Sequence, residues 1–172
     1  MRQYYSEGQV IDSGPFGTIY RIMKKDTGIE YTAKVFKMEG ADEYVAPLRW
    51  AKEASNLCKF AGDNRFFRLV AKYFEPERKS LALVLEDVKG INLETYIERT
   101  GLEVVPEKAI WQIATQVIRG MCRANQSNLM HLNLKPNSIF LVDNEDKNKI
   151  DVKLIDVGCA NKFNKTCGQF IN

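Results

Sequence analysis

One loop decides the fold prediction for this chain: His131-Leu132-Asn133-Leu134-Lys135-Pro136-Asn137-Ser138. It follows the clearest helical pattern in the sequence, residues 106–124, where apolar side chains recur at i, i+3, i+4 and i+7. Two apolar runs come next, 139–142 and 152–155, and they predict a hairpin around a charged loop. A second motif ends that hairpin: Leu154-Ile155-Asp156-Val157-Gly158. Two polar motifs thus lie at the ends of regular elements, where side chains can do chemistry.

The two motifs resemble the catalytic loop H-R-D-L-K-P-x-N and the D-F-G motif of protein kinases. In that family the Asp of the loop accepts the proton of the substrate hydroxyl, and the Asn five residues later holds a magnesium ion. Asn133 and Ser138 stand at these positions, and Leu132 replaces the Arg between His and Asp. An amide has no proton-accepting pKa near neutrality, so Asn133 cannot act as a general base. The resemblance therefore implies a kinase-like chain with disabled chemistry, a pseudokinase, in which His131 is structural.

The length and composition are those of an ordinary globular protein. The 172 residues suffice for one domain or two small lobes, and 45% hydrophobic with 27% charged residues is typical of globular proteins. A net charge of +3 without basic clusters argues against a nucleic-acid partner. No apolar run reaches the roughly 20 residues of a membrane span, and the N-terminus lacks an apolar signal core. We therefore expect an intracellular, cytoplasmic protein with reduced thiols at Cys58, Cys122, Cys159 and Cys167.

The N-terminal half reads as strands around one helix. Residues 8–37 predict three strands, Arg68 to Phe74 and Leu81 to Glu86 predict two more, and residues 41–60 predict a helix. We take the apolar stripe of that helix to be Leu48, Ala51, Leu57 and Phe60, and Asn92 to cap a later short helix. The resemblance implies an α+β fold. On this resemblance we expect residues 1–88 to form an antiparallel five-stranded N-lobe sheet with the family's C helix, and residues 89–172 to form a truncated, mainly helical C-lobe.

The resemblance also implies a nucleotide site. Gly14 and Gly17, between the first two strands, let a backbone approach phosphate closely, although they could equally make a tight hairpin. Lys34 stands where kinases contact the α- and β-phosphates, although the alternative is an ordinary surface Lys. Glu53 stands where its carboxylate partner lies, although a Glu on a helix is usually solvated. The positions that the resemblance assigns to a nucleotide are Ile11, Gly14, Gly17, Ile19, Thr32, Lys34, Glu53, Glu86, Val88, Phe140 and Asp156.

We expect this site to be weak. Asp12 replaces the first glycine of the loop and repels phosphate, and Thr32 and Phe140 narrow the adenine slot. Asp156 is the one metal ligand that the motifs retain, and a single carboxylate holds magnesium poorly. The interpretation therefore requires neither ATP nor magnesium as a cofactor, and no catalytic residue is expected.

Three functions remain open. The first is a non-catalytic scaffold or structural subunit, the second an ATP-binding Ser/Thr kinase with atypical motifs, and the third a nucleotide sensor without turnover. A kinase would continue beyond Gly158 through several helices, so either another protein covers the truncated lobe, or the tail does so, or the chain is a fragment of a longer protein. We expect the interface at Trp111, Ile118, Cys122, Phe163 and Phe170.

Overall fold

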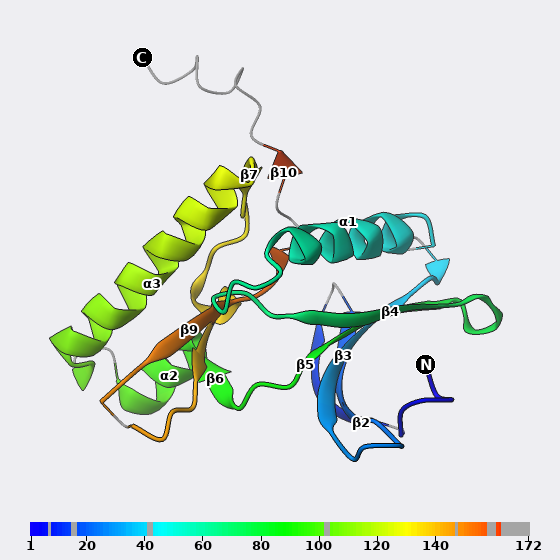
Figure 1. Ribbon diagram of the computed structural model, residues 1–172, viewed down its shortest axis with the longest axis horizontal. Coiled ribbons are helices and arrows are strands. Elements are labelled where there is room, and N and C mark those ends of the chain that lie inside the picture. The colour runs from blue at the N-terminus through cyan, green and yellow to red at the C-terminus, as the bar shows by residue number, and fades with distance from the viewer. Residues whose placement is uncertain are drawn as a thin grey trace. The chain divides into compact units, whose positions relative to one another are not determined.

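The computed structural model describes residues 1–6, 8–14, 17–40, 43–101, 104–146 and 148–157, and the backbone of 161–162. The chain divides into two compact units, Met1–Lys89 and Gly90–Asn172, which are described separately (Figure 1). Within the described residues, every helix is too short or too polar to span a bilayer.

Unit 1 is built on a five-stranded antiparallel sheet, as predicted. Its strands lie in the order β1-β2-β3-β5-β4 (Figure 1). The two central strands, β3 and β5, pair in register from Tyr31–Glu86 to Lys37–Ser80. A short 3₁₀ turn, η2 (Pro76–Arg78), joins β4 to β5. The strand bounds are β1 (Gln9–Gly14), β2 (Gly17–Met23), β3 (Glu30–Lys37), β4 (Leu69–Glu75) and β5 (Ser80–Glu86).

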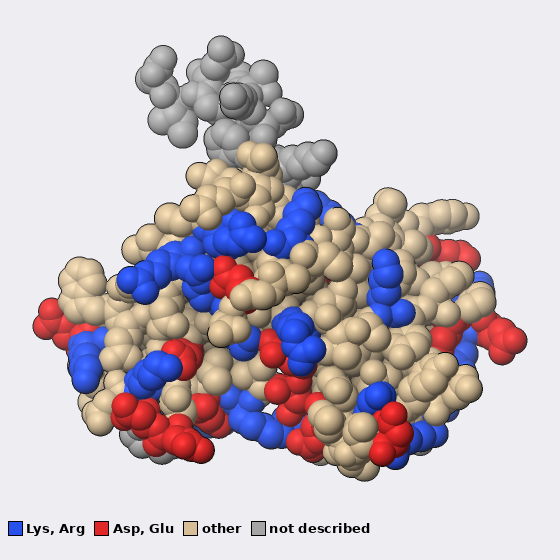
Figure 2. Space-filling view, viewed as in Figure 1, with Lys and Arg blue, Asp and Glu red and all other residues tan. Residues whose placement is uncertain are grey.

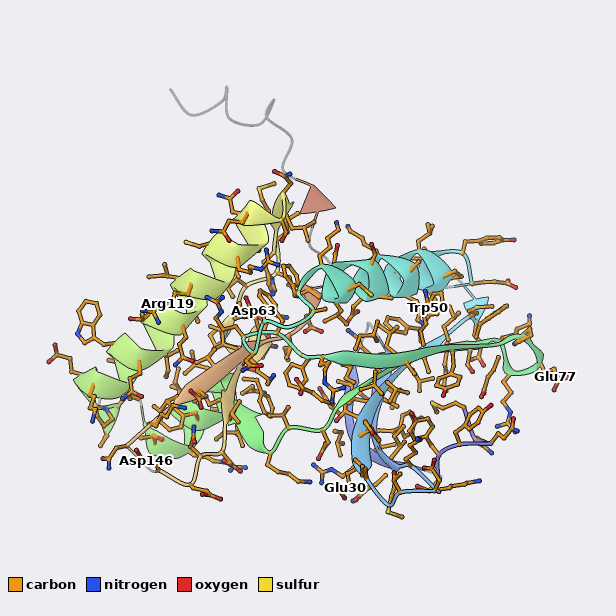
Figure 3. All side chains as sticks on the ribbon, viewed as in Figure 1. Glu30, Trp50, Asp63, Glu77, Arg119 and Asp146 are labelled. Atoms are coloured by element: carbon orange, nitrogen blue, oxygen red, sulfur yellow. The ribbon has the colours of Figure 1, made fainter. Side chains whose placement is uncertain are left out.

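One helix, α1 (Val45–Lys59), packs against this sheet. Trp50 anchors it, because its indole Nε1 donates a hydrogen bond to the carbonyl of Ala82 in β5, 3.0 Å away (Figure 3). The predicted apolar stripe is wrong in part: Leu57 is buried, but Leu48 is 71% exposed and Ala51 is exposed too. At about 100° per residue, positions 48 and 51 fall on the side opposite Leu57. The face toward the sheet carries Ala46, Glu53, Ala54, Asn56 and Leu57.

The other face of the sheet is covered by the N-terminal segment. Tyr5 is buried in a small core with Ile22, Ala33 and Val84. Its ring meets the ring of Tyr73 edge-on, with centroids 6.1 Å apart. Burial, with the neighbouring Tyr73 hydroxyl, raises the pKa of Tyr5 to about 12, so the phenol is neutral at physiological pH. Both faces of the central strands are thus shielded from water.

Unit 2 combines two helices with a small sheet. The helices are α2 (Leu93–Thr100) and α3 (Glu107–Gln126), and the prediction that Asn92 caps α2 is confirmed, since its side chain accepts a hydrogen bond from Thr95 N at 2.8 Å. The three strands lie in the antiparallel order β6-β8-β9. The sequence did not predict the short strands β6, β7 and β10. The remaining bounds are β6 (Gly90–Asn92), β7 (Leu129–Met130), η4 (Pro136–Ser138), β8 (Ile139–Val142), β9 (Asp151–Leu154) and β10 (Asn161–Lys162).

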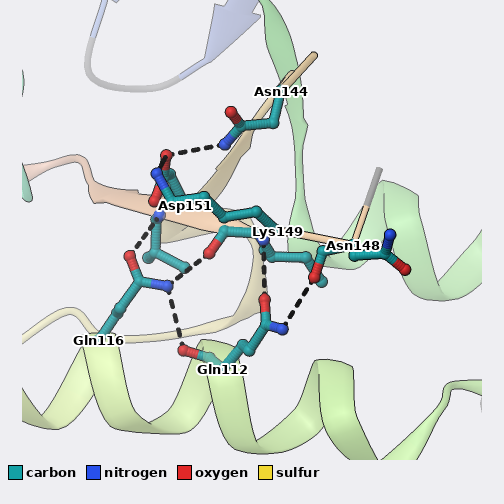
Figure 4. Close-up of polar contacts among 8 residues, drawn as sticks. Gln112, Gln116, Asn144, Asn148, Lys149 and Asp151 are labelled. Atoms are coloured by element: carbon teal, nitrogen blue, oxygen red, sulfur yellow. Dashed lines mark hydrogen bonds and ion pairs between the residues drawn. The ribbon is translucent and has the colours of Figure 1, made fainter. Parts of the chain in front are cut away.

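Two glutamines of α3 bind the free edge of β9 (Figure 4). The amide of Gln112 donates to the carbonyl of Asn148 at 3.0 Å and accepts from the N–H of Ile150 at 2.8 Å. Gln116 repeats this one turn later, with the carbonyl of Ile150 at 2.6 Å and the N–H of Val152 at 3.0 Å. Four helical residues advance about 6 Å and two strand residues about 6.6 Å, so the two spacings match. The helix thus acts as a surrogate neighbouring strand.

The apolar pattern predicted for residues 106–124 needs a correction, because Gln112 and Gln116 face the sheet. Its members are Ile110, Ile113, Ala114, Val117, Ile118 and Met121. Ile113 is buried, as expected, but Ile110 is 52% and Ile118 62% exposed. Trp111, which is 65% exposed, and Cys122 share their side of the helix. We call these four residues, Ile110, Trp111, Ile118 and Cys122, the outer face of α3.

Candidate functional site

Lys34 and Glu53 come together inside unit 1. Lys34 lies at the centre of β3, and its Nζ is 2.9 Å from both carboxylate oxygens of Glu53 on α1. Only 8% and 7% of the two side chains are exposed. Nζ also lies over the ring of Phe36, 5.4 Å from its centroid. A buried ammonium and carboxylate in this geometry hold α1 against the sheet and fix the position of one positive charge.

The turn between β1 and β2 requires glycine for steric reasons. Gly14 pairs with Gly17 across the hairpin, and Pro15 and Phe16 lie outside the described residues. Gly17 has φ +131°, and a Cβ there would lie 2.6 Å from the carbonyl oxygen of Val35. This close packing explains Gly17 without a ligand, so the phosphate role remains a prediction. The carboxylate of Asp12 is turned onto its own loop, where it accepts from Ser13 N at 2.8 Å; Ile11 on β1 is exposed and Ile19 on β2 is half-buried.

Beyond β5, a carboxylate that the sequence analysis did not single out organises the chain. One oxygen of Asp87 accepts the hydroxyl of Thr32 at 3.0 Å, and the other lies 2.9 Å from Lys89 Nζ. Arg21 Nε lies 3.6 Å away, and Lys89 also pairs with Glu30 at 2.7 Å. Burial pushes the pKa of Asp87 upward, but hydrogen bonds from Lys89 and Thr32 outweigh it and hold the pKa below its ordinary value. Asp87 is therefore a charged, nearly buried hub.

Three residues that were predicted to contact a nucleotide, Thr32, Glu86 and Val88, lie at or beside Asp87. Thr32 uses its hydroxyl to bind Asp87. Glu86 is held from the other side, since its N–H donates to Arg68 O and its carboxylate accepts from Arg68 N, both at 3.0 Å. Val88 lies between Asp87 and Lys89, both of which are tied to the sheet. The segment is thus fixed in place, and its contact with an adenine stays a prediction.

In unit 2, His131 holds the kinase-like loop to the strand end. Its Nε2 lies 3.0 Å from the carbonyl oxygen of Ile155, and the side chain is buried. Burial lowers the pKa of His131 below its ordinary value, so the neutral ring donates through Nε2. Among the described residues, Nδ1 has no hydrogen-bond partner. The next residue, Leu132, has φ +58°, an unfavourable left-handed conformation for its type.

The hydroxyl of Ser138 forms its hydrogen bonds within the loop itself. The residue is fully buried, and its hydroxyl oxygen accepts from Lys135 N at 2.9 Å. The single hydroxyl hydrogen lies within reach of two carbonyl oxygens, Asn133 at 3.1 Å and Lys135 at 2.8 Å. Three loop backbone groups therefore surround the oxygen that occupies the family's metal position. This side chain braces a turn and does not fit a magnesium ligand.

Ser138 of the loop lies next to Ile155, which follows strand β9 and precedes Asp156. Ile155 N donates to the carbonyl of Ser138 at 3.0 Å, and Asp156 follows with φ +60°. Among the described residues, no group of three or more His, Cys, Asp or Glu side chains could share a metal ion. Phe140 lies in β8 opposite Asn92 and Lys153. Gly158, Phe163 and Phe170 lie outside the described residues.

Comparison with known proteins identifies the family. The family model for the protein kinase domain matches residues 5–169, so the chain belongs to the protein kinase domain family. The chain is similar to myosin light chain kinase family member 4 of Mus musculus, with 25% identity across 92% of this chain and 38% of that protein. It is also similar to two Arabidopsis thaliana proteins. One is serine/threonine-protein kinase ATG1c, with 29% identity and coverages of 91% and 20%. The other is cyclin-dependent kinase B2-2, with 24% identity and coverages of 89% and 48%.

The chain spans less than half the length of each of these relatives. The match to the family model confirms the resemblance that was inferred from the sequence, at the level of the family and its fold.

Proposed function

We propose that this chain is a catalytically inactive kinase-like domain that serves as a scaffold in a protein assembly. The observation that carries the proposal is the state of the loop at 131–138. Asn133 stands at the base position, and Ser138, at the metal position, is fully buried with its hydroxyl bound to backbone groups.

The chemistry of phosphoryl transfer explains why these two changes matter together. Positioning and charge neutralisation supply most of the rate, and bound metal supplies much of the neutralisation. Asp156 could contribute one carboxylate, but magnesium keeps its waters and needs further oxygen ligands to bind well. Asn133 cannot accept the proton of an incoming hydroxyl. We therefore expect no measurable transfer to protein substrates.

The test is transfer from radiolabelled ATP to generic protein substrates, with an active kinase as the positive control. Restoring Asn133→Asp alone should not rescue transfer, because Ser138 still supplies no ligand. Transfer by the wild-type chain that disappears in Lys34→Ala would overturn the proposal, since it would trace the activity to this site rather than to a contaminant.

A second function, nucleotide binding without turnover, is favoured by the Lys34–Glu53 pair. The pair holds an ammonium where the family contacts phosphate, so that part of the site needs no rearrangement. Our expectation is weak binding with little dependence on magnesium. A thermal-shift titration tests it, because ligand at 100 times its dissociation constant adds about 2.7 kcal/mol of stability. A large shift with ATP and magnesium that is absent with ATP alone would contradict the expectation.

The scaffold role needs a surface, and we propose the outer face of α3. Its exposed Trp111 and Ile118 sit one above the other on the helix, and the indole Nε1 of Trp111 is fixed by Glu107 Oε1 at 3.2 Å. Large exposed apolar groups that cluster in this way mark interfaces. The same helix carries Lys108, Arg119 and Arg123, and Figure 3 shows Arg119 on it, while Figure 2 shows Lys and Arg side chains gathered over this part of unit 2. A partner that offers apolar groups rimmed by carboxylates would complement it.

Sedimentation of the purified chain tests this surface. The wild-type chain should self-associate or lose solubility, because no described residue covers the face. Ile118→Asp should restore a monomer, and Trp111→Ala should act in the same direction. Lys108→Ala, an exposed change at the edge of the same helix, is the control and should behave as wild type. A monomeric, soluble wild-type chain would refute the surface.

A further inference from the structure

Residues 1–6 lie across the face of the unit 1 sheet that α1 does not cover, and we call them the strap. A backbone bond holds the strap beside the end of β2, since Ser6 N donates to the carbonyl of Met23 at 2.9 Å. Tyr5, which is 3% exposed, fills the core beneath the strap. The strap is therefore docked by one buried side chain, and it leaves the preceding residue, Tyr4, 52% exposed.

Four tyrosine rings form a continuous row from the surface of the strap into the sheet. The ring of Tyr4 lies over that of Tyr73 in β4, with centroids 6.3 Å apart and planes inclined by 34°. Tyr73 meets Tyr5 edge-on at 6.1 Å, and Tyr5 meets Tyr31 edge-on at 5.8 Å. All three distances lie in the range of about 4.5–7 Å at which aromatic rings pack in contact. Tyr4 is the exposed end of the row, and the half-buried Tyr73 is its direct neighbour.

We propose that Tyr4 and Tyr73 are a site of oxidative cross-linking, at which a dityrosine bond fastens the strap to β4. A peroxidase-type oxidant, with hydrogen peroxide as the electron acceptor, removes one electron and one proton from each phenol. The two phenoxyl radicals carry spin on the ring carbons next to the oxygen, and a carbon–carbon bond forms between one such carbon of each ring. Each of these carbons then loses its hydrogen as a proton, while each phenol oxygen gains one. The product has lost two hydrogen atoms, and one hydrogen peroxide has become two waters.

The surroundings of the other tyrosines favour this pair over its alternatives. Tyr5 is shielded from oxidants, and burial raises its pKa to about 12, so its phenol gives up a proton less readily. Tyr44 is 81% exposed, but its ring contacts no tyrosine among the described residues, so it can couple only between molecules. The ring of Tyr4 is accessible and, as an exposed side chain, reorients within nanoseconds, which lets it close on Tyr73.

The cross-link makes the docked strap a permanent part of the sheet. It joins two residues that are about 70 positions apart in the chain. A covalent link across a loop of this length stabilises chiefly by restricting the unfolded chain. The midpoint of urea unfolding of unit 1 should therefore rise by up to about 3 M after oxidation.

The test treats the full chain, with its thiols alkylated, with a peroxidase and hydrogen peroxide at low protein concentration. After tryptic digestion, mass spectrometry should find the peptide of residues 3–21 joined to that of residues 73–78, with two hydrogen atoms lost. The monomer should also gain dityrosine fluorescence. Tyr4→Phe and Tyr73→Phe should each abolish this product, because phenylalanine forms no phenoxyl radical. Both variants keep the aromatic ring, so the strap stays docked.

Tyr44→Phe is the matched control, because it removes the most exposed tyrosine that the structure describes. It should leave the product within the monomer unchanged and reduce only the coupling between molecules. The proposal is overturned if the wild-type chain yields only coupled dimers, or if the joined peptides persist in Tyr4→Phe. An oxidised, cross-linked monomer that unfolds at the wild-type urea concentration would equally overturn it, since the bond would then not fasten the strap.

Discussion

The buried pair of Lys34 and Glu53 offers the sharpest test of how unit 1 is stabilised. The perturbation is Glu53→Gln, which keeps the shape and removes the charge. At 2.9 Å, and with an effective dielectric constant of about 20, the attraction lost is about 6 kcal/mol. The amide still accepts one hydrogen bond from Lys34, and the ammonium can relax, so the loss is not complete. The net cost of leaving one buried charge without its partner is about 3–5 kcal/mol.

Urea unfolding measures this cost. The chain has two tryptophans, so a Trp111→Phe background leaves Trp50, on α1, as the only indole reporter. With a urea slope of about 1.5 kcal/mol per molar, the midpoint should fall by about 2–3 M. The matched control is Glu43→Gln, whose ion pair with Lys79 is 3.6 Å long and about half exposed. Such a surface pair contributes about 1 kcal/mol or less.

A double variant separates the charge from the packing. Lys34→Met combined with Glu53→Met removes both charges and leaves apolar side chains of similar length, so stability should return to within about 1 kcal/mol of wild type or exceed it. The reasoning is refuted if Glu53→Gln unfolds at the same urea concentration as Glu43→Gln. It is equally refuted if the double variant is as unstable as the single one.

Three further outcomes are expected. Ser138→Ala should cost about 1–3 kcal/mol in chemical denaturation, because Lys135 N then loses its buried acceptor; an unchanged midpoint would show that the hydroxyl is dispensable. Since burial lowers the folded-state pKa of His131, the unfolded chain binds the proton more readily. The stability that neutral His131 contributes is full above about pH 6.5 and is lost as the pH falls toward the folded-state pKa. The melting temperature of the wild-type chain should therefore fall between about pH 7 and 5.5, and His131→Gln should reduce this pH dependence. Gly17→Ala should lower the melting temperature, with strain of about 1–3 kcal/mol from φ +131° and the contact with Val35, whereas Gly14→Ala, with no neighbour within 4 Å, should cost less.

The sequence predicted features that depend on neighbouring residues better than features that depend on residues far apart in the chain. Alternation and turn residues predicted all five strands of unit 1, and local chemistry predicted the Asn92 cap. The buried side of α1 was harder to predict, because Leu48 and Ala51 are apolar yet lie on its exposed side. When both faces of a helix carry apolar residues, periodicity alone cannot say which one is buried.

The polar contacts could not be predicted for a different reason. Asp87 binds Thr32 across 55 residues, and Gln112 binds Asn148 across 36. A lone Asp or Gln is usually solvated, so neither residue type nor local spacing singles it out. One weak signal existed: Gln112 and Gln116 are four residues apart on the face of α3 that otherwise buries Ile113, where a polar pair is unexpected. Their long-range partners only became evident once the topology placed β9 beside the helix.

The loop at 131–138 shows how a kinase fold can be built with Asn133 and Ser138 in place of the family's Asp and Asn. Three contacts shape this loop. His131 Nε2 donates to the carbonyl of Ile155, Lys135 N donates to the hydroxyl oxygen of Ser138, and Ile155 N donates to the carbonyl of Ser138. None of them needs a carboxylate at 133 or an amide at 138. The serine hydroxyl satisfies buried backbone groups that would otherwise cost stability, so it supports the fold at a position where it supplies no metal ligand. Stability and catalysis therefore depend on different atoms of the same eight residues, and this separation is what the proposal of an inactive scaffold requires.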